Sequence, residues 1–186
     1  MAQVSKEQRR EKVIEVLNNA RARELNAILQ YMNQHYNLDN MDYGDMAAKL
    51  KLIAVDEMRH AEMFADRIKE LDGEPTSEPA AKAVKGQVVE AVFPFDANLE
   101  DETIAAYNEF LLVCRENGDS TSVKLFEAII DEEQIHFNYF DNTADHIKNL
   151  DGTYLAQIAG TPSTTGLATQ GFVARQGGGG TPAAGA

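Results

Sequence analysis

The sequence has 186 residues, enough for one domain, and 44% hydrophobic with 25% charged residues is ordinary for a soluble globular protein. Its formal net charge of −13 argues against a nucleic-acid partner or an anionic membrane surface. The single cysteine, Cys114, excludes an intramolecular disulfide framework or a multi-thiolate metal site and fits a reducing compartment. The charged N-terminus has no apolar signal segment, and no apolar run approaches the roughly 20 residues of a transmembrane helix. We therefore expect a cytoplasmic protein that has no membrane partner.

Two long helices are predicted at the start of the chain. The first runs from Lys6 to Leu38, and Ser5 and Gln8 have the spacing of a capping box at its start. Its apolar residues recur every three or four positions and so mark one buried face. The second helix runs from Tyr43 to Leu71, with Asp42 as its expected N-cap.

A connection of about 25 residues with three prolines separates this pair from the next helix. It contains a β-prone patch at Gln87–Val92 and is too apolar from Val88 to Phe95 for a free linker. We expect it to run as a strap along the outside of the other helices. The third helix is predicted from Leu99 to Glu116, with Asn98 as its cap.

The fourth helix is predicted to begin at Asp119 or Ser120 and to continue to Asn149, where Gly152 ends it. A brief fifth helix is expected at Thr153–Ala159.

The lengths of the connections predict how these helices pack. Two short connections make the first and second helices, and the third and fourth, antiparallel neighbours. One long crossover between the second and third helices is the connectivity of ferritin-like folds. We therefore predict an all-α, ferritin-like four-helix bundle over residues 1–160. A Gly-rich tail, residues 161–186, is too poor in apolar residues to be expected to order.

Two copies of Glu-x-x-His carry the chemistry of the sequence. Glu57 with His60 and Glu133 with His136 each follow a lone glutamate by 33 residues. A shift of 76 residues superimposes the two halves without a gap, and it also matches further residues: Ile28 with Ile104, Tyr31 with Tyr107, and Phe64 with Phe140. Residues i and i+3 share a helix face, so each motif can offer a carboxylate and an imidazole to one metal ion.

Four carboxylates and two imidazoles suit a pair of iron or manganese ions and match structural zinc poorly. A single Glu-x-x-His is usually a solvated pair on a helix surface, but the matched repeat favours a site. Two lone glutamates plus two such motifs are also the ligand pattern of ferritin-like di-iron proteins. We therefore predict two iron ions per subunit, held by Glu24, Glu57, His60, Glu100, Glu133 and His136.

Two tyrosines and two histidines lie outside the predicted set of metal ligands. Tyr31 and Tyr107 lie two turns beyond the lone glutamates on the same face, where each can hydrogen bond a ligand carboxylate or serve as an ordinary core tyrosine. His35 and His146 have no partner at ligand spacing and are expected at the surface or at helix ends.

From about residue 10 to residue 160 the sequence resembles the bacterioferritins, the haem-binding branch of the ferritins. The most specific stretches are Arg23–Ile28 with Tyr31, Asp56–Glu62, and Asp131–Glu133 leading into His136. The resemblance implies that the six residues are ferroxidase ligands, with Glu57 and Glu133 as bridges.

The resemblance also implies a role for Met58, which the pattern alone would make an interface or core methionine. It makes Met58 the axial ligand of a haem at a twofold interface, one haem per dimer. A histidine that some members use with an aspartate for an accessory iron site is Leu52 here, which puts that accessory site in doubt.

The assembly and activity that the resemblance implies concern iron storage and detoxification. A homo-oligomeric cage of 24 subunits, built from twofold dimers, would oxidise Fe(II) with dioxygen or peroxide and store a ferric mineral. An electron-donor protein would serve iron release.

Three alternatives remain open. A rubrerythrin-like di-iron peroxidase would keep about two metals per bundle, but such proteins usually add an iron domain with four cysteines. A non-enzymatic haem-binding electron-transfer or structural assembly would use the di-metal site only to hold the fold. A mini-ferritin of the starvation type places iron between subunits, which the pattern within one bundle does not suit.

Overall fold

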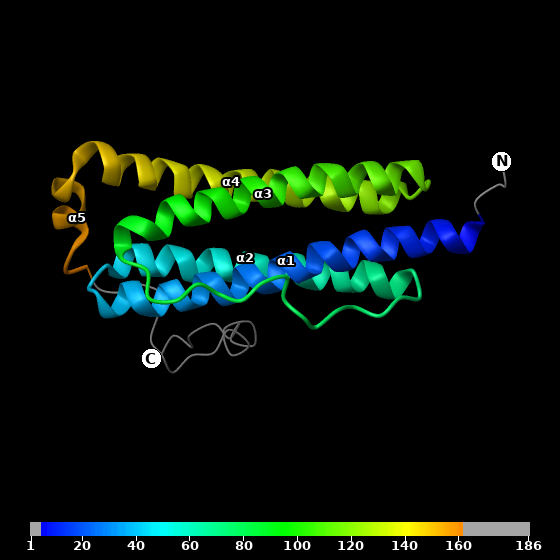
Figure 1. The fold of residues 1–186 in the computed structure, drawn as a ribbon, viewed down its shortest axis with the longest axis horizontal. Helices are drawn as coiled ribbons and strands as arrows, with labels where there is room; N and C mark the ends of the chain where they lie inside the picture. The colour runs from blue at the N-terminus through cyan, green and yellow to red at the C-terminus, as the bar shows by residue number, and fades with distance from the viewer. Residues whose placement is uncertain (1–4, 162–186) are drawn as a thin grey trace, which may run out of the picture.

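The computed structural model describes residues 5–161. Within this range the secondary structure consists of α-helices, and no strand is present. Four long helices, α1 (Lys6–Asn40), α2 (Gly44–Glu70), α3 (Val89–Glu116) and α4 (Ser120–Leu150), form two antiparallel hairpins that lie side by side (Figure 1). A short helix, α5 (Gly152–Ile158), lies across one end of the bundle (Figure 1). The predicted all-α four-helix bundle with one long crossover and a short fifth helix is confirmed.

The first hairpin shows how its two helices begin. The Ser5 hydroxyl accepts a hydrogen bond from the Gln8 backbone at 3.1 Å, and the Gln8 side chain accepts one from the Ser5 backbone at 3.0 Å, so the predicted capping box is present. The predicted N-cap of α2 is wrong, because Tyr43 occupies that position and its side chain makes no capping hydrogen bond. Asp42 instead turns the chain with φ of 61°, a left-handed conformation that aspartate tolerates better than most residues.

Helix α3 begins ten residues earlier than predicted, at Val89 rather than Leu99. The prediction of a β-prone patch at Gln87–Val92 is also wrong, because most of it forms the first turn of α3. Three apolar residues at helical spacing are buried there against the core: Val89, Val92 and Phe93. Tertiary burial therefore overrides the β-propensity of the valines.

Pro94 lies inside α3 without ending it. It removes one bond of the helix, from its own missing N–H to the carbonyl of Glu90, and both residues are exposed, so water can satisfy that carbonyl. The prediction that Asn98 caps the helix is wrong, because Asn98 lies within the helix, where its side chain donates to Glu102 Oε1 at 2.9 Å. Because Pro94 lies near the start of α3, the sequence predicted a shorter helix than the structure has.

The connection between α2 and α3 runs as a strap along α1, as predicted (Figure 1). Asn18 donates to the Glu74 carbonyl at 3.1 Å and accepts from the Thr76 backbone at 2.7 Å. The Gln30 side chain makes both bonds with Val84. It donates to the Val84 carbonyl at 3.1 Å and accepts from the Val84 backbone N–H at 2.7 Å. Side-chain amides of α1 thus satisfy backbone groups that have no secondary structure of their own.

In the second hairpin a predicted N-cap of α4 is confirmed, but Gly152 begins α5 rather than ending α4. Of the two predicted caps for α4 the structure uses Asp119, which accepts from the backbone of Ser122 at 3.1 Å and pairs with Arg67 of α2 at 2.8 Å. Asp151, with φ of 48°, separates α4 from α5. The predicted tail lies outside the described residues apart from Thr161, so the proposed domain division stays a prediction.

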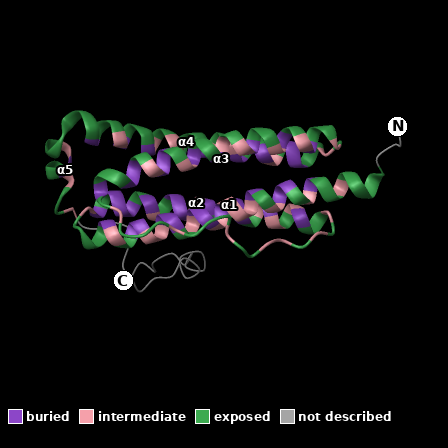
Figure 2. Cartoon of the chain, viewed as in Figure 1, coloured by how far each residue is buried: buried purple, intermediate pink, exposed green. Residues whose placement is uncertain are grey.

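Buried residues line the inner faces of both hairpins (Figure 2). Two aromatic-rich clusters form the core. One contains Tyr31, Phe93 and Phe140, and the other contains Phe64, Tyr107 and Phe126. Between them along the helices lies a layer of buried glutamates and histidines. This layer, enclosed by apolar side chains on both sides, is where the candidate site lies.

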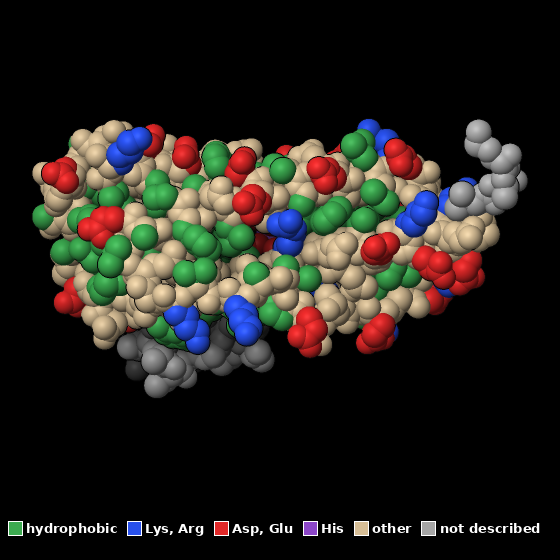
Figure 3. Space-filling model, in the orientation of Figure 1, with side chains coloured by type: hydrophobic (Ala, Val, Ile, Leu, Met, Phe, Trp, Pro, Cys, Tyr) green, Lys and Arg blue, Asp and Glu red, His purple; other side chains and the backbone are tan. Residues whose placement is uncertain are grey.

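The surface mixes charged and apolar side chains. On the face drawn in Figure 3, hydrophobic side chains reach the surface among separate acidic and basic ones. Several large apolar residues are exposed on the helices: Leu29, Leu52, Met58, Leu112 and Ile135. Among the described helices, none combines the length and the apolar character that crossing a membrane would require.

Gly73 offers a test of the packing at one end of the first hairpin. A Cβ atom there would lie 2.8 Å from Ile68 Cγ2 and 3.0 Å from Ile14 Cγ2, closer than side chains tolerate. Gly73→Ala is expected to lower the free energy of unfolding by ~1–3 kcal/mol, as overpacking usually does. Denaturant unfolding measures this. Gly152→Ala is the control, since nothing lies within 4 Å of its Cβ position, and equal stabilities of the two variants would contradict the prediction.

Candidate metal centre

All six predicted ligand residues meet in the buried layer, and none is more than 5% exposed. They form two groups of four: Glu24, Glu57, His60 and Glu133, and Glu57, Glu100, Glu133 and His136. Within each group one ligand atom per residue lies within 4.8 Å of the others. The two groups share Glu57 and Glu133, so the arrangement is that of two adjacent cation sites with two common carboxylates.

Helix geometry turns each histidine towards the shared glutamates. His60 Nδ1 lies 3.1 Å from Glu57 Oε2 and 3.1 Å from Glu133 Oε1. His136 Nδ1 lies 3.0 Å from Glu57 Oε1 and 3.1 Å from Glu133 Oε2. Each glutamate therefore contacts the histidine one turn along its own helix and the histidine of the other hairpin. The i, i+3 spacing and the antiparallel pairing of the helices produce this crossed pattern.

Each of the two tyrosines belongs to a core cluster and also donates a hydrogen bond to one lone glutamate. Tyr31 of α1 donates to Glu100 of α3, and Tyr107 of α3 donates to Glu24 of α1. Each tyrosine thus reaches the other hairpin rather than the glutamate of its own helix. Both rings are fully buried, so each hydroxyl holds one carboxylate in a fixed place.

The carboxyl groups differ in their protonation. Burial, together with the neighbouring Glu133 and Glu57, raises the pKa of Glu24 and of Glu100 well above its ordinary value. Burial alone would also raise the pKa of Glu57, but hydrogen bonds from the histidines outweigh it and lower that pKa to about 2. The two lone glutamates therefore hold a proton more readily than an ordinary carboxyl group, whereas Glu57 is ionised near pH 7.

The histidines show the opposite balance. Burial would lower the pKa of His60 and His136, but hydrogen bonds to Glu133 and Glu57 outweigh it and raise both values to about 10. Protons on the two histidines thus stabilise this layer at the positions that metal ions would take.

The donor set fits iron. Glu57 Oε1 and Glu133 Oε1 are buried yet accept no hydrogen bond of regular geometry, so each keeps a lone pair directed into the centre. Carboxylate oxygens with imidazole nitrogens, and no thiolate, form a ligand set suited to iron or manganese. The six residues can therefore hold two such ions without a change of fold.

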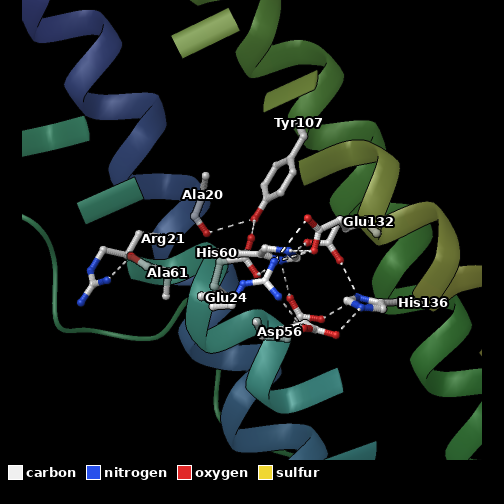
Figure 4. A network of polar contacts seen from close by, with 12 residues as sticks. Ala20, Arg21, Glu24, Asp56, His60, Ala61, Tyr107, Glu132 and His136 are labelled. Carbon is white, nitrogen blue, oxygen red and sulfur yellow. Dashed lines mark hydrogen bonds and ion pairs between the residues drawn. The ribbon is translucent and has the colours of Figure 1, made fainter. Parts of the chain in front are cut away.

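The contacts of three charged residues beside the centre were not predicted from the sequence. Glu132 Oε2 lies 3.2 Å from His60 Nε2, and Asp56 Oδ2 lies 3.7 Å from His136 Nε2 (Figure 4). Arg59 pairs with both of these carboxylates. A signal was present, because the acids stand directly before the two Glu-x-x-His motifs and are themselves 76 residues apart.

Met58 lies outside this layer, on the exposed side of α2, with 51% of its surface accessible. With Leu25, Ile28 and Val55 it lines an apolar surface hollow of about 450 Å³. Leu52, which replaces the histidine of an accessory iron site, is exposed and cannot ligate a metal.

The two remaining histidines behave differently from each other. His35 was expected at the surface or a helix end, and this is wrong. It is buried, and its Nδ1 lies 2.8 Å from the Ala47 carbonyl, which joins α1 to α2. A lone histidine on a helix gives no sign of such a backbone partner. His146 is exposed, as predicted.

Comparisons with known proteins agree with this geometry. A family model described as a ferritin-like domain matches residues 14–150. A bacterioferritin from Desulfovibrio desulfuricans is 62% identical over 169 residues, which is 91% of this chain and 94% of that protein. The bacterioferritin BfrA of Mycobacterium tuberculosis is 33% identical over 82% of this chain and 96% of its own length.

Solved structures give the same relationship. An X-ray structure of the Desulfovibrio desulfuricans bacterioferritin, described as showing the di-iron site in different catalytic states, superimposes with a TM-score of 0.87. It is 62% identical and covers 90% of this chain and 98% of its own. The Mycobacterium tuberculosis BfrA structure superimposes with a TM-score of 0.75 at 32% identity, over 79% of this chain and 93% of its own. The chain belongs to the ferritin-like family, in its bacterioferritin branch.

Proposed function

We propose that this chain is the subunit of an iron-storage protein that oxidises Fe(II) to Fe(III) at the buried centre, with dioxygen or peroxide as the oxidant. The observation that carries the proposal is the pair of buried four-residue groups that share Glu57 and Glu133. The 62% identical bacterioferritin, whose structure is described by its di-iron site, supports it.

In this proposal each group binds one iron. Glu24 and His60 hold the first ion, Glu100 and His136 hold the second, and the shared Glu57 and Glu133 bridge them. Two bound Fe(II) ions supply two electrons to one oxidant and so avoid releasing a one-electron-reduced oxygen species. Hard carboxylate ligands favour Fe(III) over Fe(II), so the residues themselves assist the oxidation.

The tyrosines and protons prepare the centre. Tyr31 and Tyr107 fix Glu100 and Glu24 at the positions that terminal ligands need, before any metal arrives. Protons on these two carboxyls and on the histidines stabilise the buried layer without metal, and metal binding must displace them. The site is therefore pre-organised before metal binds.

Storage requires assembly, and the surface is compatible with it. Large apolar side chains such as Leu52, Leu112 and Ile135 are exposed on the long helices, as interface residues are before assembly. We propose a homo-oligomeric cage of 24 subunits that encloses a ferric mineral, located in the cytoplasm and served by an electron-donor protein during iron release. The acidic net charge of −13 favours the approach of Fe(II).

Met58 is the proposed haem ligand. A soft thioether beside an apolar hollow suits a porphyrin, and its exposure on α2 suits a site shared with a second subunit. One haem per dimer would then be bound by two symmetry-related methionines.

Stepwise aerobic addition of Fe(II) to the metal-free protein, followed by desalting, tests the storage function. Retention of soluble iron far beyond the two ions that the paired groups can hold is expected, because a cage accumulates oxidised iron. Saturation near two ions per subunit would instead favour the rubrerythrin-like peroxidase.

Glu133→Ala tests the centre itself. Loss of a shared carboxylate releases both ions from their reacting positions, so the initial rate of Fe(II) oxidation, followed by the absorbance of Fe(III), is expected to fall about 100-fold or more. Glu127→Ala, an exposed glutamate on the same helix, should keep the wild-type rate. An unchanged rate in Glu133→Ala would remove that residue from the centre.

Metal binding is expected to release protons. The pKa values of the lone glutamates are raised and those of the two histidines are raised to about 10, so anaerobic Fe(II) binding should release protons from Glu24, Glu100, His60 and His136. Because binding requires the deprotonated forms, the affinity should rise with pH below the pKa of about 10 of the histidines. A pH indicator in weakly buffered solution counts the protons. Binding without release, or an affinity that falls with rising pH, would contradict the assignment.

Met58→Leu should abolish the haem absorption bands of protein supplied with haem, since leucine keeps the apolar volume but removes the sulfur ligand. Iron oxidation should continue, because the side chain is not part of the buried centre. Met41→Leu, which alters another exposed methionine, is the control and should bind haem normally. Equal haem content in both variants would exclude Met58 as the ligand.

A further inference from the structure

A hollow of about 600 Å³ lies between α1 and α3, and the strap lines one of its sides. The two helices belong to different hairpins and pack against each other on the face drawn in Figure 1. Ala80 of the strap lines the hollow and donates its N–H to the Ala22 carbonyl of α1 at 2.8 Å. The hollow therefore has walls from both hairpins and from the strap, and its volume is in the range of small-molecule sites. None of the six candidate metal ligands lines it.

A buried polar side chain in this hollow lacks a partner. Asn26 of α1 is only 8% exposed, and its Oδ1 has no hydrogen-bond partner among the described residues. Thr103 of α3, a second buried polar residue, lines the same hollow. A buried acceptor without a donor destabilises a fold, so such an atom beside a hollow indicates a bound molecule that donates to it.

The 76-residue repeat shows how the two helical walls differ. It relates Asn26 to Glu102 and Arg23 to Leu99, and all four of these residues line the hollow. One matched pair thus consists of two hydrogen-bond acceptors, an amide oxygen and a carboxylate. The other pair consists of a guanidinium and an apolar side chain. The hollow lies where the two halves of the repeat meet, but the groups that it presents are not equivalent.

The two charged groups of the hollow are not used by each other. Arg23 and Glu102 form no ion pair, and within residues 5–161 neither pairs with another charged group. Glu102 Oε1 accepts from Asn98 at 2.9 Å, and its other oxygen has no described partner. A simple cation would meet the uncompensated Arg23, and a simple anion would meet Glu102. A ligand that carries both charges can satisfy both residues, because hydrogen bonds to ionised groups are the strong ones.

We propose that this hollow binds a free α-amino acid with an apolar side chain, as the zwitterion. The ammonium group donates to Asn26 Oδ1 and Glu102, and the carboxylate accepts from Arg23. The side chain packs against Leu99 and Phe110, which supply the apolar part of the lining. Because the ligand contacts α1 and α3 together, binding also stabilises the packing of the two hairpins. This site is independent of the metal centre and goes beyond iron storage.

Saturation-transfer NMR on the full-length protein, titrated with L-leucine, tests the site. Two probes each lack one charge of leucine: 3-methylbutylamine has no carboxylate, and 4-methylpentanoate has no ammonium group. Each is expected to bind about 10-fold more weakly or worse, because it loses one charged contact. Arg23→Gln should bind leucine no better than 3-methylbutylamine, and Glu102→Gln should bind it no better than 4-methylpentanoate. Glu109→Gln, an exposed acid of α3 that does not line the hollow, should match the wild type.

The possible results separate the kinds of ligand. Tightest binding by leucine, lost in both charge variants, supports the amino-acid site. Equal or tighter binding of 3-methylbutylamine would indicate a cation site, and equal or tighter binding of 4-methylpentanoate an anion site, and either result would overturn the assignment. Absence of leucine binding, or unchanged binding in Arg23→Gln and Glu102→Gln, would overturn it as well. The three probes decide the question on the wild type alone if a variant does not fold. No outcome depends on iron oxidation, so this site and the proposed function fail separately.

Discussion

The rest of the structure depends on enclosing four carboxyl groups and two imidazoles in a layer that is almost completely buried. Buried charges are costly unless they are paired, and here the ion pairs of His60 and His136 with the shared glutamates supply the pairing. Two aromatic clusters on either side exclude solvent, and this strengthens every electrostatic interaction within the layer. Enclosing these groups is unfavourable for the free energy of folding, but the same enclosure makes the layer selective for cations.

Because of the 76-residue repeat, a small number of interaction types is enough to build the whole centre. Each element of the centre occurs twice, and most contacts cross from one hairpin to the other: Tyr31 to Glu100, Tyr107 to Glu24, and Glu132 to His60. The site and the apolar clusters around it therefore join the two hairpins, together with the Arg67–Asp119 ion pair. The candidate ligand residues themselves contribute contacts between the two halves, because each histidine pairs with a glutamate of the opposite hairpin.

The sequence predicted the centre better than it predicted the helix boundaries. Ligand identity depends on spacing along regular helices, and the matched Glu-x-x-His motifs made it readable from residues such as Glu57 and Glu133. The predicted start of α3 was wrong because Val92 is typical of a strand and Pro94 usually ends a helix. The tertiary surroundings of this segment favour a helix instead. The burial of His35 was not predictable, since its partner is a backbone carbonyl on the next helix.

The repeat is exact in the ligands but only partial around them, and this makes the two halves of the centre unequal. On the Glu100 side, Asp96 is fully buried and accepts from Gln34 at 2.7 Å, and burial raises its pKa well above the ordinary value. At the matching positions on the Glu24 side stand Ala20 and Phe110, which are apolar. A symmetric ligand set therefore lies between a polar and an apolar environment. Two ions bound there would differ in the electrostatic field around them, so the chain itself, and not only the oxidant, distinguishes one metal position from the other.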